Sequence, residues 1–133
     1  MKKSITVITI LILTIILAGC ASTQGENVKN TYENISAKEA KEIMDEKNGY
    51  IILDVRTEAE YDQGHIPNAV LLPNETIGTE EIDILPDKDQ LILVYCRSGN
   101  RSKQAAAKLV NLGYTNVYEF GGIIDWPYDI VAD

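Results

Sequence analysis

Short, continuous runs of apolar residues are the feature that most constrains what this chain can fold into. The runs YIILDV at residues 50–55 and LILVY at residues 91–95 are rich in β-branched side chains, and Asp54 is the only charged residue in them. Such runs are typical of strands that are covered on both faces, as in parallel sheets. Shorter runs at residues 69–72 and 116–120 predict two further strands.

Helical segments are predicted between these strands. Two of them begin at capping boxes, in which a Ser or Thr is followed three residues later by Glu: Ser36 with Glu39, and Thr57 with Glu60. We expect the first to run to about Lys47, the second to stop at Gly64, and a third to span residues 98–111, with a helical turn within residues 76–85. Strands that alternate with helices predict an α/β fold, with a mostly parallel central sheet of four to five strands flanked by helices.

The first 20 residues have the pattern of an export signal. Lys2 and Lys3 precede the apolar run from Ile5 to Ala18, which is shorter than the roughly 20 residues of a membrane span. The run ends in Leu-Ala-Gly-Cys and resembles the lipobox of bacterial lipoproteins, in which the Cys is acylated and becomes the first residue after cleavage. An uncleaved N-terminal anchor is the alternative, and both imply an exported protein held at the bacterial cell membrane.

The lipobox resemblance predicts three parts of the chain. These are a lipoprotein signal peptide at residues 1–19, a lipidated Cys20 with a flexible polar tether at residues 20–34, and one domain at residues 35–133. Loss of the signal peptide would remove Lys2 and Lys3, so that the 12 Lys and Arg become 10 against 20 Asp and Glu, a formal net charge of −10. Nucleic acids and anionic membrane surfaces both favour clusters of Lys and Arg. We therefore expect no nucleic-acid partner, and membrane attachment through the lipid anchor only.

The two cysteines have different surroundings. If Cys20 carries a lipid, Cys96 is the only free thiol and has no intramolecular disulfide partner. A leftover thiol in an exported protein is either a reactive group or a small buried apolar residue. The residues around Cys96 decide between the two.

Cys96 directly follows the predicted strand LILVY and precedes a predicted helix. Ligands of an open parallel sheet bind beyond the C-terminal ends of its strands, and the backbone N–H groups of a helix N-terminus favour negative charge. Gly99 permits the backbone angles of a tight anion-binding loop, while Arg97 and Arg101 add positive charge and planar donors suited to an oxyanion. The pattern predicts a lowered pKa and a reactive thiolate at Cys96.

Three motifs, in order along the chain, resemble those of the rhodanese family of sulfurtransferases. CRSGNRS at residues 96–102 is similar to the family's active-site pattern Cys-x-x-Gly-x-Arg. LDVRTEAEYDQGHIPNAV at residues 53–70 resembles its Asp-Val-Arg and Gly-His-Ile-Pro signatures, and GGIIDW at residues 121–126 resembles its Gly-Gly-x-x-x-Trp. The likeness covers roughly residues 35–130. Asn68 stands where Gly is common in the family, and Asn tolerates the same turn geometry.

The resemblance implies transfer of sulfane sulfur with Cys96 as the nucleophile. A small sulfur-containing anion such as thiosulfate or polysulfide would leave a persulfide on Cys96, and a thiol or other thiophilic acceptor would remove the sulfur. No metal or organic cofactor is implied. The residues expected to bind the donor and the persulfide follow Cys96 in the loop: Arg97, Ser98, Gly99, Asn100, Arg101 and Ser102.

Two other classes of function stay open. Relatives that act on phosphate or arsenate have one more residue in the loop, whereas Cys96 to Arg101 is six residues here, which disfavours a phosphatase or arsenate reductase. A membrane-tethered persulfide carrier, or a non-catalytic interaction module, would need the same loop residues.

Three polar residues outside the loop each allow two interpretations. Asp54 and Arg56 could form a second catalytic pair, but structural support of the neighbouring loop is the favoured interpretation. His65, the only His, is the residue type of a cysteine-protease base. Its place in Gly-His-Ile-Pro instead indicates a loop residue held by hydrogen bonds.

Overall fold

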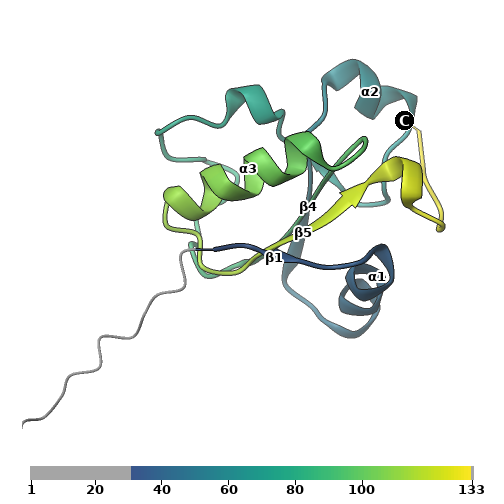
Figure 1. Cartoon of the computed structure of the whole chain (residues 1–133), viewed down its shortest axis with the longest axis horizontal. Coiled ribbons are helices and arrows are strands. Elements are labelled where there is room, and N and C mark those ends of the chain that lie inside the picture. The colour runs from purple at the N-terminus through teal and green to yellow at the C-terminus, as the bar shows by residue number, and fades with distance from the viewer. Residues whose placement is uncertain (1–30, 133) are drawn as a thin grey trace, which may run out of the picture.

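The computed structural model describes residues 31–132, so the expected signal peptide, Cys20 and most of the expected tether lie outside the described residues. A five-stranded sheet forms the centre of this part of the chain (Figure 1). Its strands are β1 (Glu33–Asn34), β2 (Tyr50–Asp54), β3 (Val70–Leu71), β4 (Leu91–Cys96) and β5 (Val117–Gly122). They lie in the order β1-β5-β4-β2-β3, and all four pairs are parallel. The predicted α/β fold with a mostly parallel sheet is confirmed.

The helices begin largely where the sequence predicts. They are α1 (Ala37–Glu46), α2 (Glu58–Gln63) and α3 (Asn100–Asn111), with 3₁₀ turns η1 (Asn74–Thr76) and η2 (Ile123–Asp125). Both capping boxes are formed, at α1 and at α2. Of the helical turn predicted within residues 76–85, only a single hydrogen-bonded turn is present, in which the Leu85 N–H donates to the Ile82 carbonyl oxygen over 2.9 Å. The 3₁₀ turn η1 lies earlier in the chain, after Pro73, whose φ of −53° suits its start. The helix predicted from residue 98 begins at Asn100 instead, because the preceding residues form a loop.

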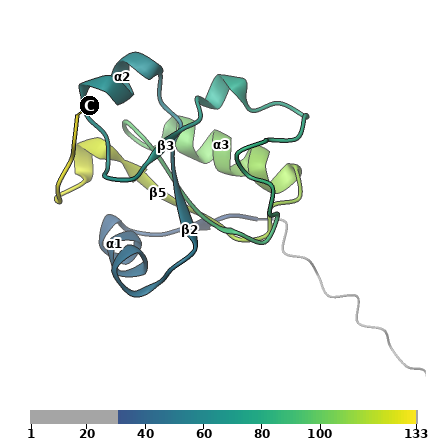
Figure 2. The same cartoon turned by 180° about the vertical axis from the view of Figure 1, so that it is seen from behind.

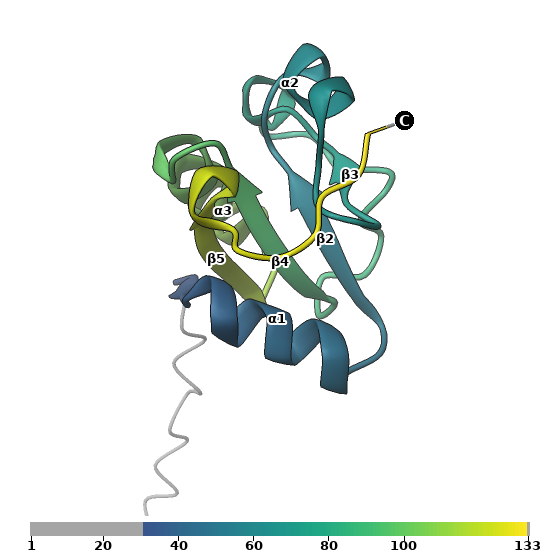
Figure 3. The ribbon, with the colours of Figure 1, turned by 90° about the vertical axis from the view of Figure 1, so that its right-hand side faces the viewer.

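Helices cover both faces of the sheet and create two core clusters. Figures 1 and 3 show α1 and α3 on opposite faces, and Figure 2 shows β2 and β3 from behind. Successive side chains of β4 alternate between the two clusters. Val94 and Cys96 pack with the residues of α3, whereas Leu93 and Tyr95 pack with Ala40 of α1. The thiol of Cys96 therefore lies on the α3 face of the sheet.

The expected tether is too long at its C-terminal end. Glu33 and Asn34, which the sequence places in the tether, form β1 and pair with Tyr118 and Glu119 of β5. Tyr32 packs against the core cluster under α3. A two-residue strand shows no periodicity, and its partner is the edge of β5, so the local sequence carries no sign of it. Within residues 31–132, no helix is long and apolar enough to span a membrane.

A matched pair of truncations tests the role of β1. We expect a chain that begins at Asn30 to retain full stability, because residues from 31 onward carry the described contacts. A chain that begins at Ile35 loses the β1 ladder and the packing of Tyr32, and we expect its free energy of unfolding to fall by about 1–3 kcal/mol. Urea unfolding of the two chains measures the difference. Equal midpoints would show that β1 contributes nothing to the domain.

Candidate active site

Cys96 is the last residue of β4 and lies at the C-terminal edge of the sheet. Its side chain points toward α3, and the residue is 1% exposed. Among the described residues Cys96 is the free cysteine. The loop of residues 97–99 turns the chain from β4 into α3 directly above the sulfur.

Gly99 shapes this loop. Its φ of 106° and ψ of −18° lie in the left-handed region, which residues with a side chain rarely adopt. In this conformation the Gly99 N–H donates a hydrogen bond to Cys96 Sγ over 3.0 Å. The loop therefore directs a backbone donor of the α3 N-terminus at the sulfur, as the sequence predicts.

Burial and hydrogen bonding have opposite effects on the pKa of Cys96. Burial is the largest single influence and opposes ionisation, but the Ser102 hydroxyl and the N–H groups of Ser102, Gly99 and Ser98 together outweigh it. The pKa of Cys96 is thus lowered from its ordinary value. A lowered pKa increases the fraction of the nucleophilic form near neutral pH.

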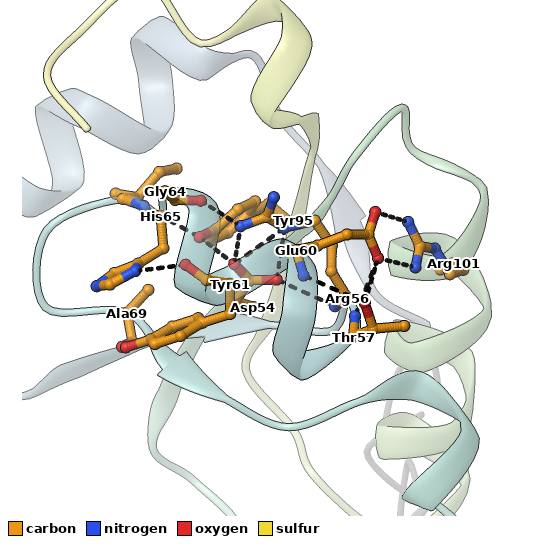
Figure 4. Close-up of polar contacts among 11 residues, drawn as sticks. Asp54, Arg56, Thr57, Glu60, Tyr61, Gly64, His65, Ala69, Tyr95 and Arg101 are labelled. Atoms are coloured by element: carbon orange, nitrogen blue, oxygen red, sulfur yellow. Dashed lines mark hydrogen bonds and ion pairs between the residues drawn. The ribbon is translucent and has the colours of Figure 1, made fainter. Parts of the chain in front are cut away.

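Arg101 forms an ion pair with a different helix. Its guanidinium donates to both carboxylate oxygens of Glu60 in α2, over 2.7 and 2.8 Å (Figure 4). Hydrogen bonding to Arg101 is the largest cause that lowers the pKa of Glu60 to about 2. The pKa of Arg101 is raised, first by Glu60 and to a smaller extent by the charge of Cys96. The contact with Glu60 joins α2 to α3 beside the loop, and substrate binding by Arg101 stays a prediction.

The other predicted loop residues differ in exposure. Arg97, Ser98 and Asn100 are exposed, whereas Ser102 is fully buried. Arg97 lines a hollow together with apolar side chains of η2 and the C-terminal segment, Ile123, Ile124 and Ile130. A solvent-exposed guanidinium at this hollow can attract an anion to an acidic protein.

The second glycine of the Gly-Gly motif permits β5 to approach the loop. A Cβ atom at Gly122 would overlap the carbonyl group of Arg97 and would lie 2.6 Å from the Cα of Ser98. Any side chain at this position would have to displace the backbone of the loop. The motif that the sequence analysis identified therefore keeps the residues after Cys96 in place.

Asp54, Arg56 and Tyr95 form a buried polar cluster at the ends of β2 and β4 (Figure 4). Asp54 accepts hydrogen bonds from Arg56 Nη2 and from the Tyr95 hydroxyl, each over 2.6 Å. Arg56 Nη2 also donates to the carbonyl oxygen of Gly64 over 2.7 Å. Burial, followed by the hydrogen bond to Asp54, raises the pKa of Tyr95, which keeps its hydroxyl a donor. The cluster ties the segment after α2 to the sheet.

His65 is held in the loop that follows α2. Its ring stacks on Tyr61 with 3.7 Å between the ring centroids, and its Nδ1 lies 3.0 Å from the carbonyl oxygen of Tyr61. Its backbone pairs with Val131 in an isolated antiparallel bridge. These contacts confirm the prediction of a loop residue satisfied by hydrogen bonds.

Glu119 is a residue that the sequence analysis missed. It lies in β5, is 3% exposed, and accepts a hydrogen bond from the Ser102 hydroxyl over 2.6 Å. A charged residue inside the predicted strand NVYEF is the one local sign that could have drawn attention to it. Its partner is 17 residues away in the sequence, so the contact itself required the fold. No group of three or more His, Cys, Asp or Glu in residues 31–132 is arranged to hold a metal ion.

The fold and the loop around Cys96 define a rhodanese-like domain. The model of the rhodanese-like domain family matches residues 36–127, and the chain belongs to this family. A sulfurtransferase of Allochromatium vinosum is 39% identical over 93 residues, which cover 69% of this chain and 85% of that protein. A tRNA uridine(34) hydroxylase of Hamiltonella defensa is 32% identical over 105 residues, but the match covers only 29% of the hydroxylase.

Solved structures agree with this assignment. A rhodanese-related protein from Thermoplasma volcanium has a TM-score of 0.65 and 31% identity. The match covers 77% of this chain and 100% of that protein. A rhodanese from E. coli, solved with anions, has a TM-score of 0.58 and 34% identity over 63% of this chain and 99% of that one. Relatives named as sulfurtransferases support a sulfurtransferase-type role for the domain.

Proposed function

We propose that the protein is a sulfurtransferase that moves sulfane sulfur from a donor such as thiosulfate or polysulfide to a thiophilic acceptor through a persulfide on Cys96. The observation that carries the proposal is the contact between the Gly99 N–H and Cys96 Sγ, at 3.0 Å. A backbone donor aimed at the sulfur stabilises a negative charge there without a general base. The pKa of Cys96 is lowered despite its burial, first by hydrogen bonds of Ser102 and then by the N–H groups of Gly99 and Ser98.

The reaction occurs in two displacements. The Cys96 thiolate attacks the outer sulfur of thiosulfate, a new S–S bond forms, and the S–S bond of thiosulfate breaks with its electron pair leaving on sulfite. The negative charge then lies on the outer sulfur of the Cys96 persulfide. An acceptor nucleophile attacks this outer sulfur, and the thiolate of Cys96 leaves. Arg97 supplies positive charge for the incoming donor anion.

We further propose that the protein is exported and anchored to the cell membrane through a lipid on Cys20. The proposal rests on the charged start, the apolar run and the lipobox-like residues before Cys20. Its consequence is that donor and acceptor must be available outside the cytoplasm. Incorporation of labelled fatty acid tests the anchor.

Turnover distinguishes an enzyme from a carrier. We expect the full-length protein to gain the mass of one sulfur atom with thiosulfate, to lose it with cyanide, and to produce many thiocyanate molecules per Cys96 when both are present. Loading without repeated turnover would favour the persulfide carrier. No gain in mass with either thiosulfate or polysulfide would overturn the proposal and leave a non-catalytic module.

A further inference from the structure

A continuous chain of three polar side chains lies behind the active-site loop. Cys96 Sγ is 3.4 Å from Ser102 Oγ, and Ser102 Oγ is 2.6 Å from Glu119 Oε1. The three residues are 1%, 0% and 3% exposed, in that order. They come from β4, α3 and β5 and meet on the α3 face of the sheet.

The Ser102 hydroxyl has one proton and several acceptors. Glu119 Oε1 is the nearest at 2.6 Å, while the carbonyl oxygens of Gly99 and Gly121 lie at 3.0 and 3.3 Å. A hydrogen bond to a carboxylate is stronger than one to a neutral carbonyl, so an ionised Glu119 holds this proton. Ser102 can then accept a hydrogen bond from the Cys96 thiol, but it cannot also donate one to the thiolate.

A thiolate and an ionised Glu119 therefore compete for the proton of one hydroxyl. Two anions on either side of a single buried hydroxyl are unfavourable, because each would be desolvated and each repels the other. Glu119 is held in this position, since its Oε1 also accepts a hydrogen bond from the Gly121 N–H over 2.8 Å. Moving one proton along the chain removes the conflict.

We propose that Glu119 is a positioning residue that shares the thiol proton of Cys96 through Ser102. The Sγ–H bond breaks as its proton passes to Ser102 Oγ, and the original Ser102 proton passes to Glu119 Oε1. The negative charge moves from the carboxylate to the sulfur, and the number of protons in the chain is unchanged. Protonated Glu119 then donates to Ser102, and Ser102 donates to the thiolate. This inference rests on the proposed function, in which Cys96 is the nucleophile.

The hydrogen-bonded side chains of Cys96, Ser102 and Glu119 lie near solvent and near other ionisable groups. Glu119 lines a hollow together with Ser98, Gly99 and Lys103, through which a proton can exchange with water. The other ionisable groups on the elements around Cys96 and Glu119 are Tyr32, Glu33, Asp54, Glu75, Tyr95, Arg97, Arg101 with its partner Glu60, Lys103, Lys108 and Tyr118. All of them remain in place when Glu119 alone is changed.

Shared protons give a distinctive titration. When Cys96 and Glu119 share one proton, only part of the molecules hold a thiolate. The thiolate absorbance then rises in two steps separated by a plateau, first when the pair loses one of its two protons and again when the shared proton leaves. We expect the ultraviolet absorbance of the Cys96 thiolate in the full-length protein to rise in two such steps. The same absorbance from the Cys96→Ser variant is subtracted, which removes the contributions of Cys20 and of tyrosines.

The Glu119→Gln variant provides the test, because Gln keeps an acceptor for Ser102 and Gly121 but cannot take a proton. We expect its thiolate to titrate in one step. Glu46→Gln, which removes the same charge from an exposed site, should keep both steps. If Glu119→Gln does not fold, infrared spectra of the parent decide: a protonated-carboxyl band at the plateau pH should be missing from Cys96→Ser.

Each outcome decides the matter. A single step in the parent shows that the two groups do not share the proton and overturns the inference, as does a two-step curve that persists in Glu119→Gln. Sulfur loading measured on the same parent sample separates this result from the proposed function. Loading with a one-step titration removes only the proton relay, whereas a two-step titration without loading removes only the sulfurtransferase function.

Discussion

We expect the Cys96→Ser variant of the full-length protein to take up no sulfur from thiosulfate and to form no thiocyanate. A serine hydroxyl fills nearly the same volume as the thiol, but it does not ionise near neutral pH, and it cannot form a persulfide. Within residues 31–132 no other cysteine can take the sulfur in place of Cys96. Intact mass after incubation with thiosulfate, and colorimetric assay of thiocyanate, measure the two losses.

Cys20→Ala is the matched control for this variant. It removes the other cysteine of the chain, and we expect it to lose labelled fatty acid while it retains sulfur loading at Cys96. Cys96→Ser should show the reverse, with fatty acid present and sulfur absent. Fatty acid that persists in Cys20→Ala would contradict the lipid anchor, and sulfur that persists in Cys96→Ser would contradict the nucleophile.

The second large effect is expected at the buried ion pair. Asp54→Ala should lower the free energy of unfolding by about 3–5 kcal/mol, because it leaves the guanidinium of Arg56 buried without its counter-ion. Arg56 is 5% exposed and Asp54 is fully buried, so water cannot replace the carboxylate. The Tyr95 hydroxyl would lose its acceptor in the same change. Urea unfolding followed by circular dichroism measures the loss.

Two further variants show whether the loss of stability in Asp54→Ala comes from the unpaired charge of Arg56. The double variant Asp54→Leu with Arg56→Met removes both charges, and we expect it to recover part of the stability, since an apolar replacement of a buried pair costs less than an unpaired charge. Glu42→Ala breaks the exposed pair with Lys38 at 3.7 Å and should cost less than about 0.5 kcal/mol. A loss in Asp54→Ala as small as that in Glu42→Ala would show that the cluster does not hold the segment after α2 to the sheet.

The sequence alone determined the elements whose signals are local. The runs at residues 50–55 and 91–95 predicted β2 and β4 because strands buried on both faces need unbroken apolar residues. The two capping boxes predicted where α1 and α2 begin, because a cap depends on residues only three positions apart. The position of Cys96 between a strand and a helix predicted a sulfur under backbone donors, since a parallel strand that leads into a helix brings them together.

Tertiary structure decided whatever depends on residues that are far apart along the chain. The sequence predicts Glu60 as part of a capping box, and the structure shows that its carboxylate also forms an ion pair with Arg101, 41 residues away. The sequence predicts Glu33 and Asn34 as part of the tether, but they pair with the edge of β5 and form a strand. In the sequence Glu119 is a single charged residue in an apolar run. Only the packing of α3 on the sheet brings it into contact with Ser102, which in turn contacts Cys96. Hydrogen bonds and ion pairs of this kind act over a few ångströms, so they exist only once the strand order has been set.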